Sequence, residues 1–306
     1  MKKSYRLLCL LCLLACLAGM GLSAPGQAEE MRYFMQSESE YASPTPYGSS
    51  AENGFYAKTA DARIYYEVYR HSDEKAPWLL MLHGGGVGSA YELGGLADAL
   101  RPRFNIVLMN TRGHGRSEIG ATQMTFRQKA DDAAAVARSV TGGKVRILGF
   151  SDGAYSAYAL AIYYPELVER IVAIGAGTLE AGFFPPKLDL AALKKMDPEF
   201  FELQERIRPE PSRMEEFLNS YMAFWNRMSV NEEMLGKIAA PVLLVAGDRD
   251  DHAPPETMLR ARSAMKNAQL LLVPGQGHMC FTRGLDIVKA AAVPFLTGQI
   301  PQERTE

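Results

Sequence analysis

Six short apolar runs recur along the chain, and most of them are separated by stretches with the periodicity of a helix. The runs cover residues 78–82, 106–109, 145–148, 171–174, 242–245 and 270–273. Continuous apolar strands that alternate with helices are typical of a parallel sheet covered on both faces. The pattern therefore predicts an α/β fold with a mostly parallel, doubly wound sheet and helices on both faces.

Two other segments depart from this alternation. Residues 55–59 and 63–69 are short aromatic and β-branched runs joined by a polar link, which predicts an antiparallel hairpin at one edge of the sheet. Residues 178–239 have helical patterns with many large apolar side chains, and we expect a helical cap inserted there after the sixth strand. Part of these side chains would line an apolar pocket and at least half would only pack: Phe183, Phe184, Phe200, Phe201, Phe217, Met222, Phe224, Trp225 and Met228.

The start of the chain has the pattern of an export signal. Lys2 and Lys3 precede an almost wholly apolar stretch at 7–22, and small residues before position 29 favour cleavage after Ala28. Residues 1–28 are thus expected to be a signal peptide, and the exported protein would be periplasmic or secreted. Two alternatives remain open, namely a lipoprotein anchored at Cys16 and an uncleaved membrane anchor. Residues 29–53 are polar and turn-rich and predict an N-terminal arm that leads into a core formed by 54–177 and 240–298.

The charge balance and the spacing of possible metal ligands exclude several classes of partner. With 33 basic and 35 acidic residues, the chain has no excess charge that would favour nucleic acid. An EF-hand reading that starts at Asp248 fails, because Ala253 stands where the loop needs glycine and Leu259 where it needs glutamate. No clustered His and Cys spacing suggests zinc, so no metal and no cofactor is expected. Oligomeric state is left open.

A sharp turn is predicted where the run at 145–148 ends. Gly149-Phe150-Ser151-Asp152-Gly153 is a G-x-S-x-G motif between a strand and a helix of small residues. The glycines are needed because the turn is strained and the helix packs closely on the strand. Ser151 would then be exposed at the carboxyl end of the sheet, where sites of such folds lie.

Polar residues follow the other strands as well, at 83–86, 110–117, 247–250 and 275–278. With these motifs the chain resembles the α/β-hydrolase superfamily over about residues 54–298, in the order nucleophile, acid, histidine. The R-G-x-G-x-S stretch and the cap resemble the branch that holds esterases, C–C bond hydrolases, haloalkane dehalogenases and epoxide hydrolases. Asn110 departs from the aspartate that this branch usually carries.

A catalytic triad can be assigned on this basis. A serine hydroxyl needs an adjacent base, and the base needs a third group that fixes its tautomer. We expect Ser151 to be the nucleophile, His278 the base and Asp250 the orienting acid, since Asp250 has the family's spacing from Gly247. Asp248 and Asp251 are expected to be solvated loop charges.

The resemblance also implies an oxyanion hole formed by the backbone N–H groups of Gly85 and Asp152. The Asp152 side chain would mainly favour the positive end of the helix dipole. Among the remaining histidines, His83 would support the glycine loop through hydrogen bonds, His114 would pack and His252 would be solvated. Cys280, the one cysteine beyond the leader, is expected to be structural even though the start of a helix favours a thiolate.

These expectations point to a cofactor-independent serine hydrolase that cleaves a carboxylic ester or related acyl compound, with a small and apolar substrate, through an acyl-enzyme on Ser151. Dehalogenases and epoxide hydrolases carry a carboxylate at the position of Ser151, which disfavours them. A C–C bond hydrolase shares the triad and remains an alternative, as does a non-enzymatic binding role. The acidic diketone of a C–C hydrolase would need cationic partners such as Arg206, Arg208 or Arg213.

Overall fold

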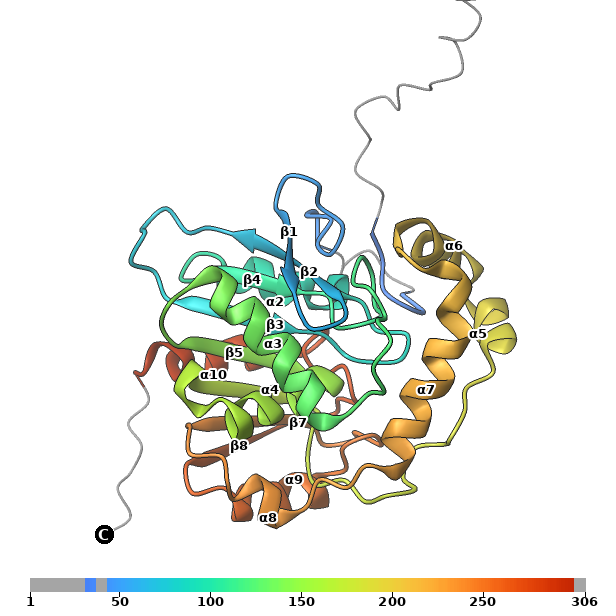
Figure 1. Cartoon of the computed structure of the whole chain (residues 1–306). Coiled ribbons are helices and arrows are strands. Elements are labelled where there is room, and N and C mark those ends of the chain that lie inside the picture. Colours follow the sequence, from blue (N-terminus) through green and yellow to red (C-terminus); the bar gives the residue numbers. More distant parts are fainter. Residues whose placement is uncertain (1–30, 37–42, 300–306) are drawn as a thin grey trace, which may run out of the picture. The chain divides into compact units, whose positions relative to one another are not determined.

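The computed structural model describes residues 31–36 and 43–299, and the leader expected at 1–28 lies outside them (Figure 1). Eight strands form one sheet in the order β1-β2-β4-β3-β5-β6-β7-β8. Their bounds are β1 Gly54–Lys58, β2 Arg63–Tyr69, β3 Trp78–Leu82, β4 Asn105–Met109, β5 Val145–Phe150, β6 Val168–Ile174, β7 Val242–Gly247 and β8 Ala268–Val273. In the described part of the chain, no helix combines the length and the apolar character that a membrane span requires.

The sheet is parallel from β4 to β8, and the predicted hairpin lies at its other edge. β1 and β2 pair antiparallel, and β2 also pairs antiparallel with β4. Successive side chains of β3 point to opposite faces, so Leu80 and Leu82 belong to one apolar core and Leu79 and Met81 to the other. Burial on both faces explains why the sequence of this strand is continuously apolar.

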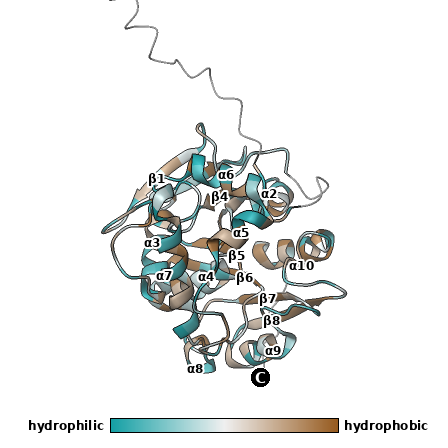
Figure 2. Cartoon of the chain, turned by 90° about the vertical axis from the view of Figure 1, so that its right-hand side faces the viewer, coloured by the Kyte–Doolittle hydropathy of each residue, from teal (hydrophilic) through white to brown (hydrophobic). Residues whose placement is uncertain are grey.

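Helices cover both faces of this sheet. One core is closed by α2 (Gly94–Leu100) and α10 (Leu285–Thr297), and the other by α3 (Phe126–Val140), α4 (Asp152–Tyr163) and α9 (Pro255–Ala264). Figure 2 shows strands coloured mainly as hydrophobic between helices that carry both hydrophilic and hydrophobic residues. The carboxyl ends of the parallel strands are left for other segments to cover.

The chain between β6 and β7 supplies such a cover. It contains α5 (Leu190–Met196), α6 (Pro198–Ile207), α7 (Met214–Arg227) and α8 (Glu232–Leu235), of which α5 to α7 stand together on the right in Figure 1. Leu179 and Val230 form an antiparallel bridge that closes the insertion at its base. Asp197 caps α6 by accepting a hydrogen bond from the N–H of Phe200 at 3.2 Å.

The segment before β1 requires a correction, because it is part of the core and does not merely lead into it. Tyr47 is fully buried, and its hydroxyl donates to Asp98 Oδ1 at 2.7 Å. The buried carboxylate of Glu67 on β2 accepts the N–H groups of Gly48 and Ser50, at 2.8 and 2.6 Å. The polar, turn-rich sequence did not predict that this segment packs on the core, because hydrogen bonds of polar groups provide much of the attachment.

Candidate active site

Ser151 lies in a strained turn between β5 and α4. Its backbone has φ 50° and ψ −118°, and Met35 is the other non-glycine residue with positive φ in the described part of the chain. A Cβ at Gly149 would lie 2.5 Å from the carbonyl oxygen of Gly153, and one at Gly153 would lie 2.1 Å from that of Leu82. Both positions therefore exclude side chains, and the turn presents Ser151 at the end of the sheet.

The structure brings the three expected triad residues together from separate loops. Ser151 Oγ lies 3.0 Å from His278 Nε2, and His278 Nδ1 lies 2.9 Å from Asp250 Oδ2. His278 follows β8 and Asp250 follows β7, so residues far apart in the chain form one continuous hydrogen-bonded series. With Nδ1 donating to the carboxylate, Nε2 is free to accept the serine proton.

Asp250 is held as a buried carboxylate. Burial by itself would raise its pKa, but the hydrogen bond and the charge of His278, together with the N–H groups of Ala253 and His252, outweigh burial and lower the pKa. These two N–H groups donate to Oδ1 at 2.9 Å each. Asp248 and Asp251 are exposed, as expected from the sequence, so Asp250 alone of the three contacts His278 Nδ1.

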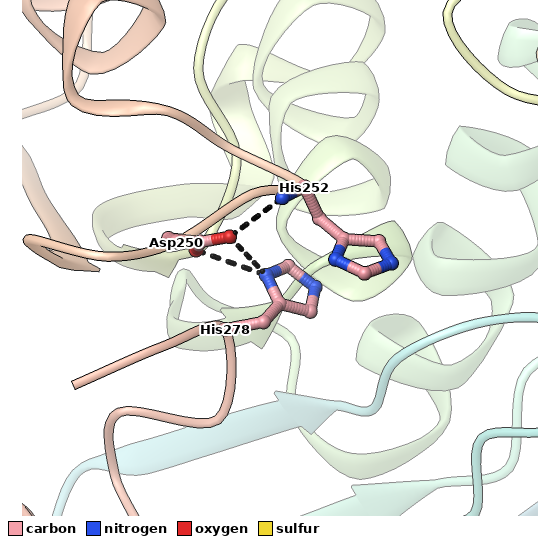
Figure 3. Close-up of side chains that lie close together, drawn as sticks. All are labelled: Asp250, His252 and His278. Atoms are coloured by element: carbon pink, nitrogen blue, oxygen red, sulfur yellow. Dashed lines mark hydrogen bonds and ion pairs between the residues drawn. The ribbon is translucent and has the colours of Figure 1, made fainter.

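His252 requires a second correction. It is half exposed, but its ring lies over that of His278 with 4.6 Å between the ring centroids and 23° between the planes (Figure 3). Its Nδ1 lies 2.7 Å from Asp251 Oδ1, and its ring also lines the pocket above Ser151. A loop histidine followed by Ala-Pro gives no periodic signal, so the sequence could not place this ring on the triad.

Among the described residues, Asp250, His252 and His278 form the group that could hold a metal ion. Each offers one ligand atom, and these atoms lie within 4.8 Å of one another. The two imidazole rings are nearly parallel, however, so their in-plane lone pairs run side by side and do not converge on one ion. His278 Nδ1 and the Asp250 carboxylate are moreover paired with each other. The donor set fits proton transfer better than chelation.

A buried histidine supports the glycine loop after β3 through hydrogen bonds. His83 Nδ1 donates to the carbonyl oxygen of Gly84 at 2.5 Å, while its Nε2 accepts the N–H of Thr111 at 3.0 Å. Burial lowers the pKa of His83 to about 4, which keeps the ring neutral. The N–H of Gly84 donates to the carboxyl group of Glu92. The expected supporting role of His83 is thus confirmed, and Glu92 is an additional support that the sequence did not reveal.

Glu92 and Tyr221 bring polar groups to the pocket side of this loop. Burial raises the pKa of Glu92 to about 8, against smaller opposing contributions from the N–H groups of Gly84 and Ser89. Tyr221 of α7 places its hydroxyl 1.5 Å from where a Cβ at Gly85 would lie, so position 85 admits only glycine. Burial, reinforced by the charge of Asp152, raises the pKa of Tyr221 well above its usual value, and the phenol stays neutral.

The side chain of Asp152 does more than complement the helix dipole. Its Oδ1 lies 2.7 Å from Nζ of Lys129 on α3, and the side chains of Asp152 and Lys129 are only 3% and 9% exposed. The ammonium group also lies 5.4 Å from the ring centroid of Tyr221 and 5.4 Å from that of Trp225. A buried ion pair thus joins α3, the start of α4 and α7 directly behind the candidate oxyanion hole.

A cavity of about 410 Å³ opens above Ser151. Its lining includes Gly85, Asp152 and His278 from the predicted site, which the structure therefore brings into one pocket. Most of the wall is apolar or aromatic, with Phe150, Tyr155, Phe184, Leu188, Met222 and Trp225 among its residues. Among the described residues that line it, there is no arginine and no lysine.

The apolar residues expected in the cap divide between pocket and core. Phe184, Met222 and Trp225 line the pocket, whereas Phe183 is exposed. The others pack within or against the core: Phe200, Phe201, Phe217, Phe224 and Met228. Tyr221 and Leu188 line the pocket without having been singled out from the sequence.

Cys280 and His114 are packing residues, as expected. Cys280 is fully buried, and burial raises the pKa of its thiol to about 12, so the start of the helix does not favour a thiolate here. His114 is buried with its ring 5.1 Å from that of Phe217. Neither residue lines the pocket above Ser151.

The sequence of this chain is similar to those of known proteins. A profile described as the alpha/beta hydrolase family matches residues 79–291. The chain is 25% identical over 266 residues to a provisionally named carbamate hydrolase of Agrobacterium fabrum, with 79% of this chain and 100% of that protein covered. It is also 25% identical to a 2-hydroxy-6-oxononadienedioate/2-hydroxy-6-oxononatrienedioate hydrolase of Pseudomonas putida, with 75% and 91% covered.

Solved structures show the same fold. The enol-lactonase from Burkholderia xenovorans LB400 superposes with a TM-score of 0.66 at 18% identity, covering 79% of this chain and 100% of that one. The relatives act on different bonds according to their names, so the chemistry of this chain has to be argued from its own pocket.

Proposed function

The chain belongs to the α/β-hydrolase family, which confirms the expected fold, and we propose that it is a serine hydrolase that cleaves apolar carboxylic esters through an acyl-enzyme on Ser151. One observation carries the proposal. The series Ser151, His278 and Asp250, with distances of 3.0 and 2.9 Å, lies at the base of an apolar pocket without cationic residues among those described. No cofactor is required for this chemistry.

The geometry supports a two-step acyl transfer. Ser151 Oγ attacks the acyl carbon and forms a C–O bond while its proton passes to His278 Nε2. The carbonyl electron pair moves to oxygen, where the N–H groups of Gly85 and Asp152 would donate to it. Asp152 is the first residue of α4, and the first N–H groups of a helix have no partner within the helix. The intermediate expels the alcohol, which takes the proton from His278. Water then repeats the sequence on the acyl-enzyme and releases the acid.

The pocket favours an ester over an acidic diketone. Arg208 does not line the pocket, and its Nη1 donates to the carbonyl oxygen of Gly113. Arg213 pairs with Glu210 and Glu216, and Arg206 is exposed; neither lines the pocket. A carboxylate placed in this pocket without a partner would cost several kcal/mol. The pocket of this chain therefore differs from what the dienedioate named for the Pseudomonas putida relative would need.

Labelling with a fluorophosphonate tests the nucleophile. We expect the wild-type chain to be labelled on Ser151 and the Ser151→Ala variant to remain unlabelled while keeping its fold. Activity should fall on the order of 10⁵- to 10⁶-fold in kcat. Ser156→Ala is the matched control, since Ser156 lies in the same helix and its hydroxyl donates to the carbonyl oxygen of Asp152. Labelling that persists in Ser151→Ala would remove Ser151 from the nucleophile's role.

A second assay separates ester from C–C bond cleavage on the same preparation. Aryl esters of short and medium acids should be hydrolysed, and ring-cleavage diketones with two carboxylates should be turned over poorly. If the diketone gives the larger kcat/KM by orders of magnitude, the esterase proposal fails and the C–C hydrolase alternative replaces it. If neither substrate class is turned over and the probe does not react, a binding role without catalysis is favoured.

We further propose that the protein is exported and begins at Glu29 after cleavage behind Ala28. The support is the sequence pattern of the leader alone. Mass spectrometry of the N-terminus of protein isolated from the exported fraction tests it. A diacylglyceryl group on Cys16 would make the protein a membrane-anchored lipoprotein and would contradict this cleavage.

A further inference from the structure

The first described residues of the chain reach the substrate pocket. Tyr33 and Phe34 line the cavity above Ser151 together with Trp225 and Leu188 of the insertion between β6 and β7. The sequence assigned these positions to a polar arm. We call residues 31–36 the strap.

The strap is fixed to α6 by a buried carboxylate. Asp197 Oδ2 accepts the N–H of Met35 at 2.8 Å and Nη2 of Arg32 at 3.1 Å. Arg32 also pairs with Glu199 at 2.8 Å. Because Asp197 is the N-cap of α6 and is 5% exposed, the same side chain orders the helix and the strap.

Packing completes the attachment. The Phe34 ring meets Phe200 and Phe201 edge to face, with centroid distances of 5.6 and 6.0 Å. Met31 and Tyr33 are buried in the core on the α2 and α10 side of the sheet. A non-glycine residue with φ 58°, as at Met35, is held in that conformation only where its surroundings fix it. The strap is thus a built part of the fold.

We propose that the strap is a wall of the substrate pocket and determines the size of apolar group that the pocket accepts. Tyr33 and Phe34 provide bulky aromatic surface but no group that the acyl transfer needs, so their effect falls on substrate affinity and chain-length preference. This proposal rests on the proposed function for its hydrolytic readout. Occupancy of the pocket provides a readout that does not depend on hydrolysis.

The first test removes wall surface in the full chain. With p-nitrophenyl acetate, butyrate, hexanoate and octanoate, Phe34→Ala should raise KM for the shortest esters about 10-fold and shift the preference toward longer ones, with kcat within about twofold. Met35→Ala is the matched control, because Met35 lies in the same segment but its side chain is 51% exposed and does not line the pocket. It should keep the wild-type profile.

The second test loosens the strap without altering a lining residue. Arg32→Ala removes both ion pairs to α6 and should shift the chain-length preference in the same direction as Phe34→Ala. Arg32→Lys keeps the positive charge and should therefore retain much of the wild-type chain-length profile. Labelling by the fluorophosphonate should be unchanged in every strap variant, which shows that Ser151 and the fold are intact.

Binding of straight-chain alcohols from butanol to decanol supplies the independent readout. Trp225 lines the pocket and is one of two tryptophans, so intrinsic fluorescence reports occupancy. Phe34→Ala and Arg32→Ala should change the alcohol length that binds best, and Met35→Ala should not. If both variants keep the wild-type order for alcohols, the strap is not a determining wall, whether or not the chain hydrolyses esters. If the wild type fails to label or to hydrolyse, the proposed function fails, and the alcohol series still decides the role of the strap.

Discussion

The imidazole ring of His252 lies nearly parallel over that of His278, with 4.6 Å between the ring centroids. The N–H of His252 donates to Asp250, so one residue fixes the carboxylate with its backbone and covers the neighbouring ring with its side chain. Phe150 lies 4.8 Å from the His278 ring as well. His278 is therefore positioned by ring contacts in addition to its hydrogen bonds.

Replacing His252 by alanine should lower kcat by about three- to tenfold, because an aromatic contact of this kind contributes about 0.5–1.5 kcal/mol. The backbone hydrogen bond to Asp250 survives the substitution. His252→Phe should retain most of the activity, since it preserves the stacked ring. Steady-state kinetics on a good ester measures this, with His71→Ala as a control outside the pocket. A loss of 10³-fold or more would mean that His252 takes part in proton transfer.

Asp250→Asn should cost on the order of 10⁴-fold in kcat, because an amide no longer holds the tautomer of His278. Asp248→Asn and Asp251→Asn are matched controls in the same loop, and their exposed side chains make a small effect the expectation. Steady-state kinetics of the three variants on one ester provides the comparison. Equal losses in all three would show that general loop charge, and not the contact with His278, matters.

Lys129→Met should destabilise the fold by about 3–5 kcal/mol, because it leaves the buried Asp152 carboxylate without its partner. Urea denaturation gives this free energy of unfolding. Lys237→Met provides the comparison, since Lys237 and Glu233 form an exposed pair that should contribute at most about 0.5 kcal/mol. If the two variants lose equally little free energy of unfolding, the expected contribution of the Lys129–Asp152 pair is contradicted. The double variant Lys129→Met/Asp152→Leu should recover part of the loss.

Glu92→Gln should change how stability depends on pH. With a pKa of about 8 in the folded state against an ordinary value of 4.5, Glu92 must take up a proton on folding at any pH between these two values, so wild-type stability falls as pH rises through this range. Glutamine has no proton to lose and can still accept the N–H of Gly84. Thermal melts should show little difference near pH 5 and a variant more stable by about 4 kcal/mol near pH 8.5. A constant difference across this range would show that Glu92 does not titrate there.

Much of the framework was readable from the sequence because its signals are local. Apolar runs placed the strands of the parallel sheet, and the two glycines around Ser151 identified the turn, since both follow from the geometry of a few neighbouring residues. The strand ends also placed Asp250 and His278 correctly near Ser151. In a parallel sheet, the carboxyl ends of the strands meet at one edge whatever the loops contain.

The contacts that shape the pocket were decided by the tertiary structure alone. Lys129 is paired with Asp152 because α3 and α4 pack side by side, and no spacing in the chain records that contact. Tyr33 and Phe34 reach the pocket through Asp197, more than 160 positions away, in a segment whose composition indicated an exposed arm. His252 gave no periodic signal because loop residues follow none. Side chains that meet only after the sheet has formed leave no pattern in the sequence, since packing selects them by shape and charge and not by their distance along the chain.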